Sequence, residues 1–269
     1  MSRYTEAKNT FIDEIDLDAY IDLESSRASY DQLAHSFKKS LKIVLVFGQP
    51  GTGKSLLLNR IYRDKRQQRE LYFFDTPIMH KKVFFSKLFN ILTKQELPQD
   101  SSIDFETFIE YLKSQKGKRE IIILLDEAQM YPEVILEKIR VLSDTGVIKF
   151  VISLHQTEDE DLIAKEHFQS RIWETIELKN ATKNELKTYI YKKLLMREQF
   201  ELANQIKDRH CALLYKYTLG NYREINKMIY TVFEIYEYYD KNNPHKIKHD
   251  TFSTKIIEMA AIKLGYIHV

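Results

Sequence analysis

The chain has 269 residues, of which 43% are hydrophobic and 30% are charged, so it can bury a sizeable core and is not disordered in bulk. Lys and Arg number 41 against 39 Asp and Glu, a formal net charge of +2, so any surface for nucleic acid would have to be local. The single cysteine, Cys211, excludes an internal disulfide and a zinc site built from cysteines.

Up to about residue 179, short apolar runs alternate with amphipathic stretches. We expect residues 1–19 to be an N-terminal arm, because this acidic stretch shows only weak periodicity. The apolar runs predict strands at Leu41–Phe47, Leu71–Thr76, Ile121–Leu125, Ile148–Leu154 and Thr175–Leu178. The amphipathic stretches predict helices at Ser29–Lys42, Ser55–Arg66, Lys81–Lys94, Phe105–Ser114 and Pro132–Ser143. This alternation is typical of a doubly wound parallel sheet, which we assign to residues 20–179.

From residue 180 onward the pattern is helical throughout. Thr182 and Glu185 form a capping box that opens a helix running to about Met196. Three more helices are expected at Ile206–Leu219, Tyr222–Tyr239 and Thr251–Leu264. The expected fold class is therefore a doubly wound α/β core followed by a small all-helical lid, with the lid and its C-terminal helix at residues 180–269.

A phosphate-binding motif lies between the first strand and the helix that follows it. The segment Gly48–Ser55 fits the P-loop pattern G-x-x-x-x-G-K-[ST]. The candidate nucleotide-binding residues are Gly48, Gln49, Pro50, Gly51, Thr52, Gly53, Lys54, Ser55 and Leu56. Glycines let the backbone aim successive N–H groups at an anion, and the helix presents the positive end of its dipole. The Lys54 ammonium can reach the outer phosphates and the Ser55 hydroxyl can ligate Mg²⁺, so the motif predicts ATP and Mg²⁺ as cofactors.

Two carboxylates follow the apolar run Ile121–Leu125. Asp126 emerges at the carboxyl end of that strand, where open α/β sheets bind ligands, and is predicted to hold Mg²⁺. The next residue, Glu127, points elsewhere and is predicted to polarise the attacking water, as a catalytic residue alongside Lys54. The nearest candidate for a guanine-specifying motif, Asn226–Ile229, lacks the required Asp. Asp126 and Glu127, with the P-loop, therefore predict Mg²⁺-dependent ATP hydrolysis.

Polar residues at the end of the fourth strand are candidate sensors of the γ-phosphate. They are Ser153, His155 and Gln156, and their strand should lie beside the first and the third. The alternative interpretation is that these polar side chains only solvate a loop.

Two arginines are candidates for contacting phosphate. Arg171 precedes the expected fifth strand and can meet transition-state charge, in some ATPases from a neighbouring subunit; a surface salt bridge is the alternative. Arg223 begins a lid helix and can couple the lid to the nucleotide. The alternative interpretation is that Arg223 is a solvated surface charge, although the dipole at a helix N-terminus disfavours arginine.

With these residues in view, the chain resembles the AAA+ ATPases of the ExeA/MshM/TniB type, near the replication-initiator end of AAA+. The resemblance spans roughly residues 20–240. Asp126–Gln129 looks like the DEAQ form of the second motif, and Tyr20–Leu33 looks like the lead-in to the adenine pocket. Gly220–Arg223 looks like the Gly-x-Pro-Arg sensor, with Tyr222 in place of Pro. His155 and Gln156 stand where the family has Gly-Gln, and Arg171 matches its Gln-Arg-Ile region.

The resemblance implies an oligomerising ATPase with a helical lid. ExeA-like members serve secretion, pili or DNA uptake, whereas TniB-like members serve transposition and touch DNA. The leading hypothesis is an assembly or remodelling ATPase for a bacterial secretion, pilus or DNA-uptake system, acting with a membrane-complex protein. The first alternative is a DNA-associated ATPase of transposition or replication, with the basic stretch Arg60–Arg69 as the place for DNA. The second is a switch with little turnover, which the intact Asp126-Glu127 pair disfavours.

The sequence also bears on where the chain acts. No apolar stretch approaches the ~20 residues needed to span a bilayer, and the polar, acidic N-terminus is not typical of a signal peptide. We expect a cytoplasmic protein that can attach peripherally to the inner face of the membrane. Since the sequence ends at Val269 without a transmembrane helix, an envelope role would require a partner.

Overall fold

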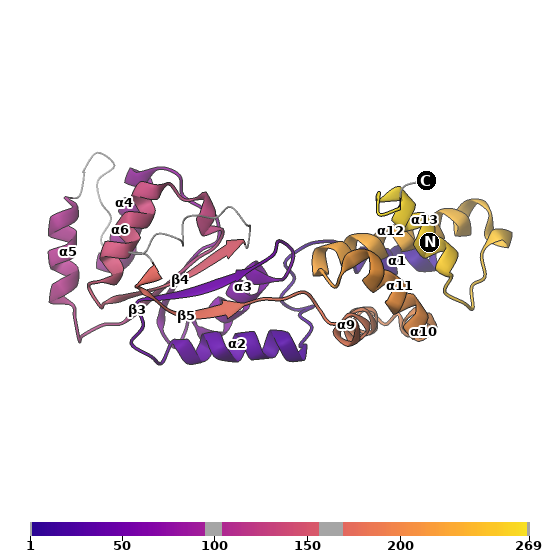
Figure 1. Ribbon diagram of the computed structural model, residues 1–269, viewed down its shortest axis with the longest axis horizontal. Helices are drawn as coiled ribbons and strands as arrows, with labels where there is room; N and C mark the ends of the chain where they lie inside the picture. The colour runs from indigo at the N-terminus through magenta and orange to yellow at the C-terminus, as the bar shows by residue number, and fades with distance from the viewer. Residues whose placement is uncertain (1, 95–103, 156–168, 268–269) are drawn as a thin grey trace. The chain divides into compact units, whose positions relative to one another are not determined.

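The structure, a computed structural model, describes residues 2–94, 104–155 and 169–267 (Figure 1). One candidate residue, Gln156, lies outside these ranges. The chain forms two compact units. One comprises Ser29–Gln49 and Lys54–Leu178, and the other comprises Met1–Ala28, Pro50–Gly53 and Lys179–Val269. No described helix is long and apolar enough to cross a membrane.

The first unit is built on a parallel five-stranded sheet with the order β2-β3-β4-β1-β5. The strands are β1 (Ile43–Gly48), β2 (Glu70–Phe74), β3 (Ile121–Leu125), β4 (Ile148–His155) and β5 (Ile172–Glu177). β4 lies between β1 and β3, as the sequence predicts. All of β3 and nearly all of β4 are buried, because helices cover both faces of the sheet. The predicted fold class, a parallel α/β core followed by a helical region, is confirmed.

Alternate residues along the strands pack into two separate cores, one on each face. Ile121 and Ile123 face the core formed with α4 (Lys81–Thr93), α5 (Phe105–Ser114) and α6 (Glu133–Ser143). Ile122 and Leu124 face the core formed with α2 (Glu24–Ser36) and α3 (Lys54–Lys65). Figure 1 shows the two groups of helices on opposite sides of the sheet. This sandwich holds the strand ends, and the loops after them, in place.

The second unit is helical. Its helices are α1 (Arg3–Asn9), α9 (Lys183–Leu195), α10 (Phe200–Gln205), α11 (Asp208–Thr218), α12 (Tyr222–Asn242) and α13 (Thr254–Lys263). The predicted capping box opens α9: the Thr182 hydroxyl accepts a hydrogen bond from the backbone of Glu185 at 3.2 Å, and the Glu185 carboxylate accepts one from the backbone of Thr182 at 3.0 Å. One continuous apolar core joins these helices.

The N-terminal segment, expected as an arm at residues 1–19, begins with helix α1, which packs into the helical core. The structure places residues 1–28 in the helical unit, and Tyr4 and Ala7 of α1 are 1% and 0% exposed. Glu237 of α12 accepts hydrogen bonds from Thr5 at 2.8 Å and Lys8 at 2.6 Å. A hydrogen bond from Lys241, together with those from Lys8 and Thr5, lowers the pKa of Glu237 to about 2. A helix of two turns carries too few apolar positions for its periodicity to stand out in the sequence.

Candidate nucleotide-binding site

The P-loop joins the end of β1 to the start of α3. Gly51 and Gly53 have φ angles of +81° and +94°, in the left-handed region that favours glycine. Lys54 is 4% exposed, and its ammonium donates hydrogen bonds to the carbonyls of Gly48 at 2.7 Å and Gln49 at 2.9 Å. Lys54 and Ser55 open α3, so their backbone N–H groups lie at the positive end of its dipole. A buried ammonium at a helix N-terminus is an environment that favours a phosphate.

Asp126 follows β3 directly and is 4% exposed. One carboxylate oxygen accepts a hydrogen bond from the Ser153 hydroxyl at 2.6 Å and another from the backbone N–H of Glu127 at 2.9 Å. Ser153 lies on β4, where it pairs with Val46 of β1. The P-loop and Asp126 therefore leave the same edge of the sheet on strands two positions apart, about 10 Å.

Glu127 turns away from the direction of β3. Its φ of 47° is left-handed, a conformation that costs a non-glycine residue free energy and that recurs at active sites. Its side chain is 47% exposed, and one carboxylate oxygen lies 4.0 Å from Nε2 of His155, the last residue of β4. A carboxylate that reaches solvent beside Asp126 can accept a proton from water.

The donor set fits Mg²⁺. The described residues contain no group of three or more His, Cys, Asp or Glu side chains able to hold a metal ion. Mg²⁺ does not need such a cage, because it binds through one or two protein oxygens and substrate phosphates and keeps several waters. Ser55 and Asp126 are the residues that would hold it, and the ion would neutralise charge on the phosphates.

Arg171 lies at the opposite edge of the sheet from Lys54. It precedes β5, whose first residue, Ile172, pairs with Ile43 at the start of β1. The P-loop leaves the other end of β1, about 17 Å along the strand. Arg171 donates to the Asp144 carboxylate at 3.1 Å, and Lys42 donates to the same group at 2.6 Å. Burial raises the pKa of Asp144, but the bonds from Lys42 and Arg171 outweigh it and hold the pKa below its usual range.

Arg223 lies beside Gly51, which belongs to the helical unit together with the rest of Pro50–Gly53. A Cβ added to Gly51 would lie 2.8 Å from the Cβ of Arg223 and 2.3 Å from Oδ1 of Asn221. Asn221 caps α12 and also donates to the carbonyl of Pro50 at 2.7 Å. The Arg223 guanidinium donates to Asp13 at 3.0 Å. Only glycine leaves room for this close approach.

The candidate residues thus separate into groups. Lys54, Asp126, Glu127, Ser153 and His155 lie at the carboxyl edge of the sheet, whereas Arg171 lies at its amino edge. Arg223 belongs to the helical unit with Gly51.

Two features near these residues were not predicted. Asn221 is recognisable in the sequence only as a helix cap, so its contact with Pro50 carries no sequence signal. The side-chain oxygen of Gln129, three residues after Asp126, is buried and lacks a hydrogen-bond partner among the described residues. A buried acceptor without a partner is costly, and a bound ligand or water can satisfy it.

The strand order and the two motifs define a P-loop nucleotide-binding protein. Residues 38–162 match the family described as AAA domain. The fold is similar to that of CDC6P from Pyrobaculum aerophilum, with 12% identity, a TM-score of 0.64, and coverage of 95% of this chain and 70% of that chain. Over residues 38–162 the chain thus resembles an AAA domain, and its fold is a parallel α/β P-loop core followed by a helical region.

Two further structures show the same fold. The ORC2 protein of Aeropyrum pernix is 15% identical, with a TM-score of 0.61 and coverage of 95% of this chain and 71% of that chain. The RuvB Holliday junction branch migration motor of Thermotoga maritima is 18% identical, with a TM-score of 0.54 and coverage of 94% and 73%. A search of curated proteins found no match.

Proposed function

We propose that this protein binds ATP with Mg²⁺ and hydrolyses it. The observation that carries the proposal is the buried Lys54 on the P-loop and the buried Asp126, held by Ser153, at one edge of the sheet. Lys54 exchanges its two loop carbonyls for phosphate oxygens, and Ser55 and Asp126 hold the metal ion. Glu127 orients water and takes its proton. The ORC2 structure is described as a complex with ADPNP and ADP, which supports an adenine nucleotide as the ligand.

Replacing Glu127 by Gln tests the proposal. The amide keeps the shape of the side chain but cannot accept the proton, so kcat should fall by about 10²- to 10⁴-fold while ATP binding is retained. Turnover is measured by phosphate release and binding by a fluorescent ATP analogue. Glu110→Gln, an exposed site on α5, is the matched control and should behave as the wild type. Undiminished hydrolysis in the Glu127 variant would exclude the role.

We also propose that copies of the chain assemble. Arg171 lies too far along β1 to reach the P-loop of its own chain, so a role in phosphate chemistry requires a neighbouring copy. In this proposal residues 20–179 form the catalytic core and residues 180–269 the lid, and Arg223 contacts nucleotide from its place beside Gly51. His155 and Gln156 complete the set of sensor candidates with Ser153.

Two roles for the hydrolysis are proposed. The DEAQ segment and the other matches to ExeA-like proteins support assembly or remodelling of a bacterial secretion, pilus or DNA-uptake system, from the cytoplasm and with a membrane-complex partner. The description of RuvB as a Holliday junction branch migration motor supports the second role, a DNA-associated ATPase. Steady-state turnover with and without DNA separates them: stimulation by DNA favours the second role, and stimulation only by membrane fractions favours the first.

A further inference from the structure

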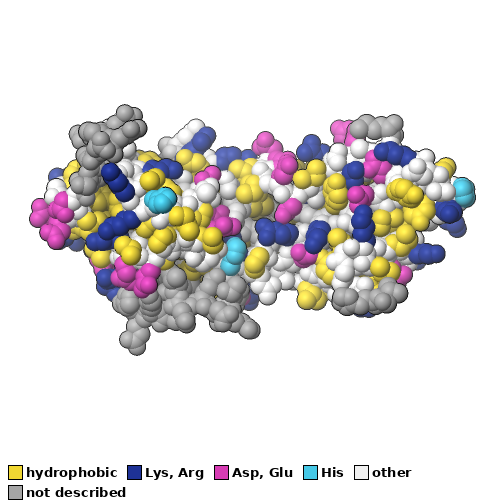
Figure 2. All heavy atoms as spheres, turned by 90° about the horizontal axis from the view of Figure 1, so that it is seen from above, with side chains coloured by type: hydrophobic (Ala, Val, Ile, Leu, Met, Phe, Trp, Pro, Cys, Tyr) yellow, Lys and Arg dark blue, Asp and Glu magenta, His cyan; other side chains and the backbone are white. Residues whose placement is uncertain are grey.

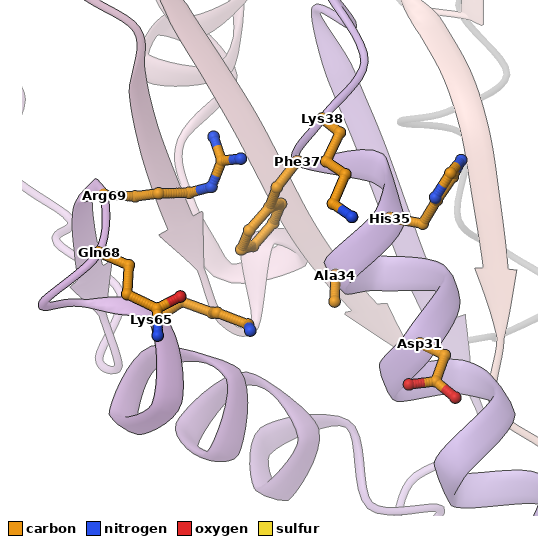
Figure 3. A pocket seen from close by; sticks show the side chains of 8 residues that line it. All are labelled: Asp31, Ala34, His35, Phe37, Lys38, Lys65, Gln68 and Arg69. Carbon is orange, nitrogen blue, oxygen red and sulfur yellow. The ribbon is translucent and has the colours of Figure 1, made fainter.

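A half-open groove lies between the C-terminal half of α2 and the segment that follows α3 (Figure 3). Its cavity volume is about 280 Å³. In Figure 3 the ammonium groups of Lys38, two residues after α2, and Lys65, the last residue of α3, point toward the space between the two helices, and the Arg69 side chain, just before β2, extends toward Phe37. The groove therefore brings together cations that are distant in the sequence.

The groove carries more positive than negative charge. Lys38, Lys65 and Arg69 line it, against a single lining carboxylate, Asp31. The guanidinium of Arg69 forms an ion pair with the carboxylate of Glu120, with 3.4 Å between Nη1 and Oε2. Neither Lys38 nor Lys65 has an ion-pair partner among the residues that the structure describes. Lysines that line one groove without forming ion pairs repel one another, and an anion bound in the groove would offset that repulsion.

Lysines at the end of a helix are ordinarily explained by the negative end of the helix dipole. At α2 another residue already fills that role. Lys149 of β4 is 2% exposed, and its ammonium donates to the carbonyls of Ser36 at 3.0 Å and Phe37 at 3.1 Å and to Glu120 at 3.2 Å. Burial lowers the pKa of Lys149, and Glu120 opposes that shift. Because Lys149 caps α2 from inside, Lys38 is not needed for this purpose.

We propose that this groove binds phosphate groups of a nucleic-acid backbone. Lysine ammonium groups on flexible stems bind phosphates as point charges, without reading base sequence. A membrane surface fits less well, since no large apolar side chain is exposed between residues 16 and 78. The face seen in Figure 2 mixes Lys and Arg with Asp and Glu, so that face carries no continuous positive surface.

The groove is separate from the ATP site. Its residues lie near the starts of β1 and β2, whereas the P-loop leaves the end of β1. α3 connects the two places: it begins at Lys54, and its 12 residues extend about 18 Å to Lys65. Nucleic acid in the groove and ATP on the P-loop can therefore be bound together. The proposal rests on the second role proposed above, a DNA-associated ATPase, and gives it a binding place. It does not depend on ATP hydrolysis, because binding is measured without nucleotide.

The test is fluorescence anisotropy of the full chain with a labelled 30-nucleotide single strand and a 30-base-pair duplex over a salt series. The double variant Lys38→Ala/Lys65→Ala should bind at least tenfold more weakly. The slope of log K against log salt should fall by about 1.4 to 1.8, from two lost phosphate contacts. Lys113→Ala/Lys118→Ala, with the same charge change at exposed sites around the end of α5, should retain wild-type binding and slope.

Three outcomes would overturn the proposal. The first is the absence of DNA binding by the wild type at low salt. The second is an equal loss in the two double variants, which would indicate a diffuse charge effect. The third is binding to vesicles containing phosphatidylserine without binding to DNA, which would assign the groove to a membrane surface. Circular dichroism melting checks that each variant folds. Binding of a fluorescent ATP analogue shows whether the ATP site is intact, so that a loss of DNA binding can be distinguished from failure of that site.

Discussion

The two edges of the parallel sheet use charged side chains differently. At the carboxyl edge, Lys54 is buried against carbonyls of its own loop, and Asp126 is held by a serine rather than by a cation. At the amino edge, Arg171 and Lys42 share Asp144. At the carboxyl edge the named partners of Lys54 and Asp126 are backbone groups and a serine, whereas at the amino edge cations and a carboxylate pair within the protein.

The direction of the strands explains the contrast. In a parallel α/β sheet each helix begins near the carboxyl edge and ends near the amino edge. Helix N-termini favour anions, so phosphate is stabilised at the carboxyl edge. Helix C-termini favour cations, which then require carboxylates such as Asp144 and Glu120. A charge at the carboxyl edge is thus a better candidate for ligand binding than a charge at the amino edge, and the groove with Lys38 and Lys65 is the exception.

The largest effect is expected at Lys54. Lys54→Ala removes the cation that meets the outer phosphates, so kcat/KM should fall by about 10³-fold and ATP affinity should drop with it. Isothermal titration with ATP and a phosphate-release assay measure both. Lys42→Ala, at the other end of β1, is the control and should keep near-normal turnover. Equal losses of turnover in the two variants would contradict the proposed difference between the two edges.

Arg171 gives the next largest effect. If it completes the site of a neighbouring copy, Arg171→Ala should lower turnover by about 100-fold or more. Mixing the Arg171→Ala and Glu127→Gln variants should restore part of the activity. At some interfaces the intact Glu127 of one copy then meets the intact Arg171 of the other. Turnover is followed against protein concentration.

A purely structural Arg171 would give a different result. Its loss would cost a partly exposed ion pair, about 1 kcal/mol of stability or less, and mixing would restore nothing.

A smaller effect is expected at Ser153. Ser153→Ala removes the 2.6 Å hydrogen bond to Asp126 and leaves the carboxylate less well oriented. A hydrogen bond to a charged group contributes about 1.5–3 kcal/mol, so we expect roughly a tenfold loss of kcat with a raised Mg²⁺ requirement. Ser153→Thr, which keeps the hydroxyl, should recover activity if the enlarged side chain fits. A Mg²⁺ titration of turnover distinguishes misplacement of Asp126 from general damage.

The smallest effect is expected at Asp144. Because the folded pKa of Asp144 is below that of the unfolded chain, its contribution is present above pH ~4 and is lost as pH falls through the folded pKa. Asp144→Asn should lower the free energy of unfolding by about 1 kcal/mol at pH 7. The difference from the wild type should vanish in acid. Urea unfolding at several pH values measures this difference in the free energy of unfolding. A loss of ATPase activity in Asp144→Asn without a loss of stability would instead connect Asp144 to function.

Sequence patterns predicted elements with a strong local pattern better than short helices. Phe105–Ser114 and Ile121–Leu125 have the bounds predicted, because one is strongly amphipathic with an Asp104 cap and the other is a run of buried apolar residues. α1 and α10 were not predicted as helices, since a helix of one or two turns shows little periodicity.

The site was predicted unevenly for a similar reason. The P-loop and the Asp126-Glu127 pair are local patterns. Which sensor candidate touches Asp126 depends on strand order, and the structure brings Ser153 into contact with it.

The sequence by itself determined the alternation of strands and helices, the P-loop and the carboxylates after β3, because each depends on residues that are neighbours in the chain. Only the tertiary structure decided which edge of the sheet each charge occupies. Arg171 and Asp144 are 27 positions apart, and Lys149 caps a helix more than 100 positions away. Such pairings follow from strand order and packing, which bring distant residues together, and a local pattern carries no record of them.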